Sequence, residues 1–80
     1  MHRIFFDTNV GTQKVGYILN LPASLRDLEA MGGALREGLH VIIYMPDELE
    51  MEAELRRDQD LKCWRAFPIP GTTKHLDKSA

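Results

Sequence analysis

The stretch that most constrains the fold is residues 39–45, Leu-His-Val-Ile-Ile-Tyr-Met, which is too apolar and too rich in β-branched side chains to lie on a surface. Gly38 precedes it and Pro46 follows it. A short apolar run between two residues that interrupt regular backbone fits a strand, whereas a helix normally needs about ten residues or more. We therefore predict a central strand against which the other elements pack.

Residues 49–55 alternate strictly between apolar side chains at odd positions and glutamate at even positions. A helix would scatter the apolar side chains around its circumference, whereas a strand places all of them on one face. We therefore predict an antiparallel hairpin of residues 39–45 and 49–55 around the loop Pro46-Asp47-Glu48. Because buried residues must face buried residues, the predicted pairs are Leu39 with Leu55, Val41 with Ala53, Ile43 with Met51 and Met45 with Leu49.

Length and composition indicate one small domain, which we place at residues 1–76, with a frayed tail at 77–80. The formal net charge of −2 gives no field that attracts nucleic acid or an anionic membrane. One cysteine, no basic and apolar leader, and no run long enough to cross a bilayer predict a cytoplasmic protein. So small a core favours an oligomer.

The N-terminal part of the chain predicts a second hairpin, with strands at residues 3–8 and 14–19 and a turn at residues 9–13. The turn contains Gly11 but neither of the glycine-rich motifs that bind phosphate. We therefore interpret it as a plain turn, shaped in part by the polar run Asp7-Thr8-Asn9.

A short helix should follow this hairpin. Ser24 and Asp27 have the spacing of a capped helix start, and Gly32-Gly33 should end the helix after about two turns. Its expected buried side consists of Leu25, Leu28 and Met31.

After the glutamate-rich strand, residues 57–60 predict a loop and residues 61–67 a third meander strand. Trp64 and Arg65 point to opposite faces of this strand. A register that buries Arg65 would place an unpaired guanidinium in the core, which is costly, so we choose the register that buries Trp64. Residues 68–71 should end the strand, and residues 72–76 should form one helical turn docked by Leu76. In the chosen register Leu55 faces Lys62, Ala53 faces Trp64, Met51 faces Ala66 and Glu52 faces Arg65.

This order of elements resembles that of SH3-like small barrels. The resemblance lies in Leu35-Arg36-Glu37-Gly38-Leu39-His40-Val41 and in Trp64-Arg65-Ala66-Phe67-Pro68. It implies a mainly β fold: a five-stranded SH3-like barrel with one short α-helix between strands 2 and 3 and a C-terminal helical turn. PilZ domains have a similar meander, but their Arg-x-x-x-Arg and Asp/Asn-x-Ser-x-x-Gly motifs have no match here, so no ligand residue is carried over. The fold alone does not fix a function.

Residues that usually carry chemistry are scattered. The potential metal ligands have none of the spacings of known metal sites; they are His2, His40, His75 and Cys63. No nucleophile elbow or helix N-terminus is expected beside Cys63 to activate its thiol, and the carboxylates lack the loop of a cation cage. We expect no catalytic residue, no metal and no cofactor.

The predicted registers place a mixed apolar and charged surface on the outer face of the meander at residues 39–67. We expect this face to bind a second copy of the chain or a protein that carries Lys or Arg among apolar residues. Its expected rows are His40, Glu54 and Cys63, then Ile42, Glu52 and Arg65, then Tyr44, Glu50 and Phe67. The candidate binding residues are Ile42, Tyr44, Glu50, Glu52, Arg65 and Phe67.

Three alternatives remain at this point. The first hairpin or the helix covers the outer face and leaves no binding surface there. A nucleic-acid or cyclic-nucleotide binding barrel, which ranks second, requires a basic face made by Arg3, Lys14, Arg26 and Lys74. An enzyme ranks last, because 80 residues without a convergent catalytic constellation rarely enclose a site that excludes water. A deep pocket that unites Cys63 with His40 would revive this alternative.

Overall fold

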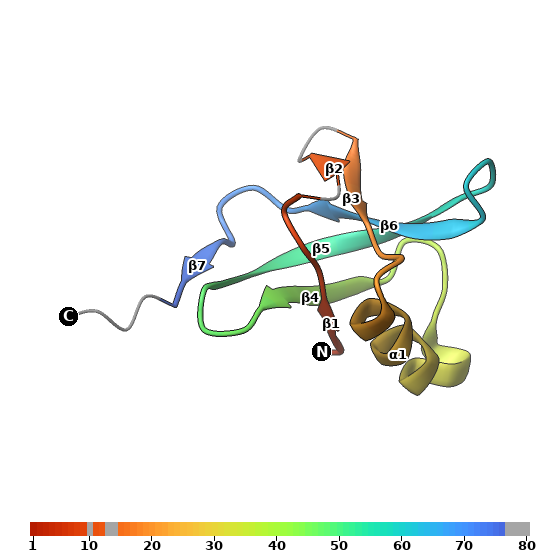
Figure 1. Ribbon diagram of the computed structural model, residues 1–80, viewed down its shortest axis with the longest axis horizontal. Helices are drawn as coiled ribbons and strands as arrows, with labels where there is room; N and C mark the ends of the chain where they lie inside the picture. Colours follow the sequence, from red (N-terminus) through yellow and green to blue (C-terminus); the bar gives the residue numbers. More distant parts are fainter. Residues whose placement is uncertain (10, 13–14, 77–80) are drawn as a thin grey trace.

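The computed structural model describes residues 1–9, 11–12 and 15–76, and in this part the chain is mainly β with one α-helix (Figure 1). The strands are β1 Arg3–Phe5, β2 Gly11–Thr12, β3 Gly16–Ile18, β4 His40–Met45, β5 Leu49–Asp58, β6 Cys63–Pro68 and β7 Lys74–His75, and the helices are α1 Pro22–Met31 and the 3-10 turn η1 Gly32–Ala34. The sheet runs in the order β1-β4-β5-β6-β3-β2, and β7 pairs with β5 beside this path. The described strands thus form an open sheet rather than the expected five-stranded closed barrel.

The predicted central hairpin is confirmed, because β4 and β5 pair in the predicted register, with Val41 opposite Ala53 and Ile43 opposite Met51. The three-residue loop is closed by the N–H of Glu48, which donates to the carbonyl of Met45 at 3.0 Å. Asp47 has a φ of 61° and so takes the left-handed conformation that Gly or Asn usually supplies in such loops. Alternation fixed the register although the loop lacks a glycine.

The register predicted between β5 and β6 is wrong by four residues. Leu55 lies opposite Ala66 instead of Lys62, and β5 continues to Asp58 before the chain turns. The Asp58 carboxylate accepts a hydrogen bond from the N–H of Leu61 at 2.9 Å, which fixes the loop two residues later than predicted. The predicted faces of this strand are nevertheless correct, since Trp64 packs against the core and Arg65 lies on the outer face.

The predicted N-terminal hairpin is also wrong. β1 runs parallel to β4, with Arg3 opposite Ile42 and Phe5 opposite Tyr44, whereas β3 pairs with β6 and β2. Alternation along β1 tells which side chains point inward but does not identify the neighbouring strand. Residues 10 and 13–14 of the predicted turn and second strand lie outside the described residues.

Helix α1 begins earlier than predicted. Pro22 occupies its first turn, and the preceding Leu21 makes no side-chain cap. Ser24 is therefore not the expected cap but a buried residue within the helix. Leu28 and Met31 are buried as predicted, whereas Leu25 is 50% exposed, so the expected buried side was placed wrongly.

The early start lets α1 cover the free edge of β1. The N–H of Phe5 donates to a carboxylate oxygen of Asp27 at 2.9 Å, and the Ser24 hydroxyl donates to the carbonyl of Phe5 at 2.6 Å. Both backbone groups point away from β4, which bonds to the flanking residues instead. Two helical side chains thus satisfy the edge groups that would otherwise be open to another strand.

The C-terminal helical turn expected at residues 72–76 is wrong, because this segment contains β7. Lys74 lies opposite Glu50 and His75 opposite Leu49, and the N–H of Leu76 donates to the carbonyl of Glu48 at 2.7 Å. β6 stops before the first half of β5, so this edge offers unpaired backbone groups that β7 takes up. The predicted frayed tail at 77–80 lies outside the described residues.

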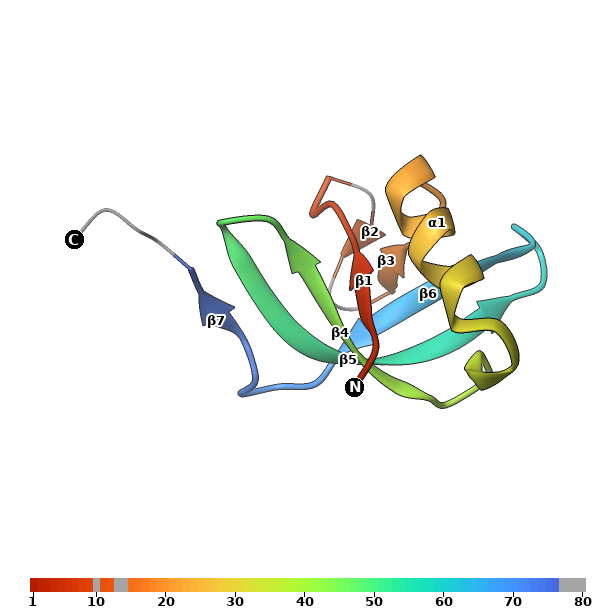
Figure 2. The same cartoon turned by 90° about the horizontal axis from the view of Figure 1, so that it is seen from below.

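The core lies on the inner face of the bent sheet, on the side where α1 packs (Figure 2). Its central members are the inward side chains of β1, β4 and β5 together with two residues of α1. This cluster of buried residues consists of Ile4, Phe6, Tyr17, Leu19, Leu28, Met31, Val41, Ile43, Met51, Ala53, Leu55 and Ala66. The opposite, outer face of β4, β5 and β6 is the one that carries the candidate site.

Candidate functional site

The outer face is built by alternation. The residues of β5 at even positions point away from the core, as do those that lie opposite them in β4. The first two members of each predicted row are confirmed: His40 with Glu54, Ile42 with Glu52, and Tyr44 with Glu50.

The third member of each row changes with the corrected register. Phe67 lies opposite Glu54 rather than in the row of Glu50. Glu52 has Ile69 beside it, since the N–H of Ile69 donates to the carbonyl of Glu52 at 2.9 Å. The row of Tyr44 and Glu50 is completed by Lys74.

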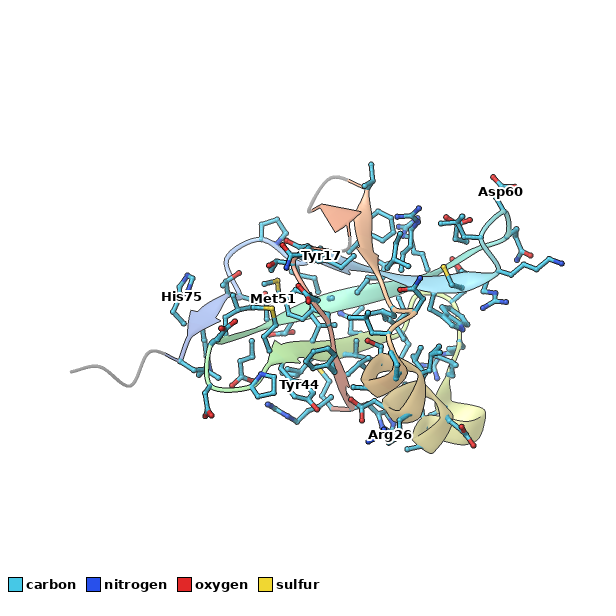
Figure 3. All side chains as sticks on the ribbon, in the orientation of Figure 1. Tyr17, Arg26, Tyr44, Met51, Asp60 and His75 are labelled. Atoms are coloured by element: carbon cyan, nitrogen blue, oxygen red, sulfur yellow. The ribbon has the colours of Figure 1, made fainter. Side chains whose placement is uncertain are left out.

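One cluster of the outer face surrounds Tyr44 of β4, which lies beside β1 (Figure 3) and whose hydroxyl reaches Asp27 of α1. The Arg3 guanidinium lies 4.9 Å from the centroid of the Tyr44 ring and 3.0 Å from a carboxylate oxygen of Glu50. The Phe5 ring meets Tyr44 edge to face at 6.1 Å, and the Tyr44 hydroxyl donates to Asp27 at 3.3 Å. Partial burial, followed by the charge of Asp27 and this hydrogen bond, raises the pKa of the Tyr44 hydroxyl above its ordinary value.

A second cluster repeats this arrangement around Phe67. The Arg56 guanidinium lies 5.6 Å from the centroid of the Phe67 ring and 3.2 Å from a carboxylate oxygen of Glu54. The backbone of Gly16 in β3 lies over the same ring, so that a Cβ at this position would come within 3.0 Å of two ring carbons. Each cluster therefore combines an aromatic ring, an arginine and a glutamate.

Arg65, one of the candidate binding residues, lies apart from these clusters. It is opposite Arg56, four residues beyond Glu52 along β5, which corresponds to about 13 Å. Its guanidinium binds the Asp58 carboxylate at 2.7 Å and the carbonyl of Val15 at 3.1 Å. The N–H of Leu61 and then Arg65 hold the pKa of Asp58 below its ordinary value. These contacts give Arg65 a structural role between the β5–β6 hairpin and the chain near β3.

The residues that the sequence left as possible chemistry do not converge. Cys63 lies opposite Asp58, whereas His40 lies opposite Glu54, about 13 Å away along β5. Within residues 1–9, 11–12 and 15–76, no group of three or more His, Cys, Asp or Glu side chains is arranged to hold a metal ion.

The basic residues required for nucleic-acid binding are also separated. Arg3 pairs with Glu50 and Lys74 lies opposite the same Glu50, so these two cations flank a carboxylate, whereas Arg26 is exposed on α1, away from β7 (Figure 3). Lys14 lies outside the described residues. The described members of the set therefore form no common basic face.

A surface hollow lies where the chain leaves β1 and passes the β4–β5 loop. It encloses about 380 Å³. Its polar side is shaped by the turn at Asp7, whose carboxylate accepts a hydrogen bond from the N–H of Asn9 at 2.9 Å, as expected for a residue that shapes a turn. The lining residues are Phe5, Asp7, Thr8, Asn9, Met45, Pro46 and Glu48.

Sequence reasoning missed Arg3, Phe5 and Arg56 as members of the outer face. Arg3 and Phe5 alternate with the buried Ile4 and Phe6, so the sequence does indicate that they point outward. Their place beside Tyr44 depends on the parallel pairing of β1 with β4, which no local pattern indicates. Arg56 was assigned next to the loop because β5 was expected to end earlier.

In the part of the chain that the structure describes, no helix is long and apolar enough to cross a membrane. Comparison of the chain with protein-family models, with curated proteins and with solved structures gives no match.

Proposed function

We propose that this chain is a non-catalytic binding module that docks another protein on the outer face of β4, β5 and β6. The observation that carries the proposal is a group of half-exposed apolar and aromatic side chains that lie in three neighbouring rows between carboxylates on this face. The side chains are Ile42, Tyr44, Phe67 and Ile69.

The placement of α1 supports this use of the outer face. Leu28 and Met31 anchor the helix in the core on the inner face, and Asp27 reaches only the rim at Phe5 and Tyr44. Within the described residues, the only α-helix therefore leaves the middle of the outer face open. An open face that mixes aromatic, aliphatic and charged side chains has the composition of a protein interface.

We also propose that the fold is related to SH3-like barrels and that the protein is cytoplasmic. The meander of β4, β5 and β6 supports the affiliation, whereas the parallel pairing of β1 with β4 departs from it. The single cysteine, which is free, favours a reducing compartment.

Capture from native lysate on three immobilised proteins tests the proposal. We compare the wild type, the double variant Tyr44→Lys/Phe67→Lys, and the control Leu25→Lys/Leu61→Lys, which adds the same charge at two exposed apolar positions elsewhere. We expect at least one protein, identified by mass analysis, to bind the wild type and the control but not the outer-face variant. Circular dichroism and urea unfolding verify that all three are folded. Identical captured sets, or no captured protein, would overturn the proposal.

A further inference from the structure

The three glutamates on the outer face of β5 differ in their partners. Glu50 pairs with Arg3 at 3.0 Å and Glu54 pairs with Arg56 at 3.2 Å. No ion pair or hydrogen bond joins the carboxylate of Glu52, which lies between them, to any described residue. Lys74, a further cation on this face, lies opposite Glu50 rather than Glu52, so among the described residues Glu52 is the one of the three glutamates without an ion pair.

The surroundings of Glu52 do not require its charge. Its backbone N–H donates to the Thr72 hydroxyl at 3.1 Å and its carbonyl accepts a hydrogen bond from the N–H of Ile69, so the backbone groups of Glu52 hold the residue in place. Ile42 and Ile69 lie on either side of it in the neighbouring chain segments. The carboxylate is therefore a single charged group in an apolar row, half-exposed to solvent.

Charge decides which kind of occupant fits this surface. A second copy related by a two-fold axis through Glu52 would bring two unpaired carboxylates together. An axis shifted along β5 would place Glu52 near Glu50 or Glu54, and each of these already has its arginine. A wholly apolar partner would cover a carboxylate that has no cation, which is costly. A partner that supplies a cation at the centre avoids all three costs, and a second copy could do so only by placing its Lys74, at the β7 edge of the face, against Glu52.

Building on the proposed function, we infer that the outer face accepts a segment of another protein in which a Lys or Arg is flanked by apolar side chains. The cation of this segment pairs with Glu52, and its apolar neighbours lie against Ile42 and Ile69. Tyr44 and Phe67, each held by its arginine, form the two ends of the surface. As the partner excludes water, the attraction between the cation and Glu52 increases. Glu52 thus selects the partner, whereas the apolar side chains supply most of the contact area.

A peptide library tests the inference. Each peptide has randomised apolar residues around one fixed central position that is Lys, Arg, Gln or Glu, and binding is measured to the wild type, Glu52→Gln and Glu52→Lys. We expect the wild type to select Lys and Arg, and Glu52→Gln to bind the selected peptides about tenfold more weakly or worse. Glu52→Lys should reverse the preference toward a central Glu. Glu29→Gln, which removes an exposed carboxylate on α1, should bind as the wild type does.

The outcomes separate this inference from the proposed function. If the selected peptides lose binding to Tyr44→Lys/Phe67→Lys but show no preference for a central cation, the inference is wrong and the outer face is still the binding surface. If binding is unaffected by Tyr44→Lys/Phe67→Lys, both are wrong. A library without a binder overturns the inference, while lysate capture still decides the proposed function. Sedimentation that shows wild-type dimers dispersed by Tyr44→Lys/Phe67→Lys would also overturn it, because the occupant would then be a second copy.

Discussion

The two faces of β5 show how one strand serves two purposes. On the inner face, Met51, Ala53 and Leu55 are almost completely buried, with exposed fractions of 4%, 0% and 0%. On the outer face, Glu50, Glu52 and Glu54 are half-exposed, and Glu50 and Glu54 each pair with an arginine. Burial on the inner face stabilises the fold, so the outer face is free to carry charges that the fold does not need.

The largest expected effect belongs to the inner face. Met51→Glu places a charge in the core without a partner and should lower the free energy of unfolding by about 2–4 kcal/mol. Urea unfolding followed by circular dichroism measures the change against the wild type. A midpoint as high as that of Glu52→Gln would show that the two faces have been assigned wrongly.

A second prediction concerns the edge of the outer face, where Gly16 of β3 lies close to the Phe67 ring. Gly16 has a φ of +83°, and a Cβ there would lie 3.0 Å from two carbons of the Phe67 ring. We expect Gly16→Ala to lower the free energy of unfolding by about 1–3 kcal/mol through strain and this clash.

Gly38→Ala is the matched control for this contact. Gly38 has nearly the same φ, +82°, but a Cβ there would meet only a carboxylate oxygen of Glu54, at 4.0 Å. It should cost about 1 kcal/mol from the backbone conformation alone. Urea unfolding measures both variants. An equal decrease in the free energy of unfolding would show that the Phe67 ring does not pack against Gly16.

The same strand shows how much of the fold its sequence predicted. The register of β4 with β5 was predictable because odd positions on both strands are apolar and only three residues join them. The register of β5 with β6 was not, because Arg57 and Asp58 have the composition of loop residues. They continue the strand, with Asp58 binding both Leu61 and Arg65. Trp64 and Arg65 did predict correctly which side chains of β6 face the core. Alternation repeats every two residues, however, so it permits register errors of two or four residues.

The candidate site was predictable to the same extent. Ile42, Tyr44, Glu50 and Glu52 share a face, as alternation requires, and Phe67 lies on it two rows away from its predicted place. Arg65 had been assigned opposite Glu52 and would have neutralised it. The slip of four residues moves Arg65 to Asp58 and leaves Glu52 without a cation, so the long-range pairing of strands determines the electrostatics of this surface.

A third, smaller effect should appear on acidification. The pKa of Asp58 is lowered in the folded state, so its carboxylate contributes stability above the ordinary Asp pKa of about 3.9 and loses it as the pH falls through the lowered value. The free energy of unfolding of the wild type should therefore decrease from pH 5 toward pH 2 more steeply than that of Asp58→Asn. Urea unfolding across this range measures both slopes. Asp60→Asn, in the same loop, serves as the control and should keep the wild-type slope.

The smallest expected effect, at Glu52, contrasts most sharply with Met51. Glu52→Gln should change the free energy of unfolding by under about 0.5 kcal/mol, because the carboxylate has no partner among the described residues to lose. Adjacent carboxylates on one face of a strand are about 7 Å apart, so Glu52→Gln also relieves weak repulsion from Glu50 and Glu54. Glu50→Gln loses its pairing with Arg3 and should be the less stable of the two. Urea midpoints at low and high salt measure this difference, which should shrink as salt screens the charges. A Glu52→Gln protein that is less stable than Glu50→Gln would mean that the Glu52 carboxylate stabilises the fold. It would then not be available to pair with a cation of a partner.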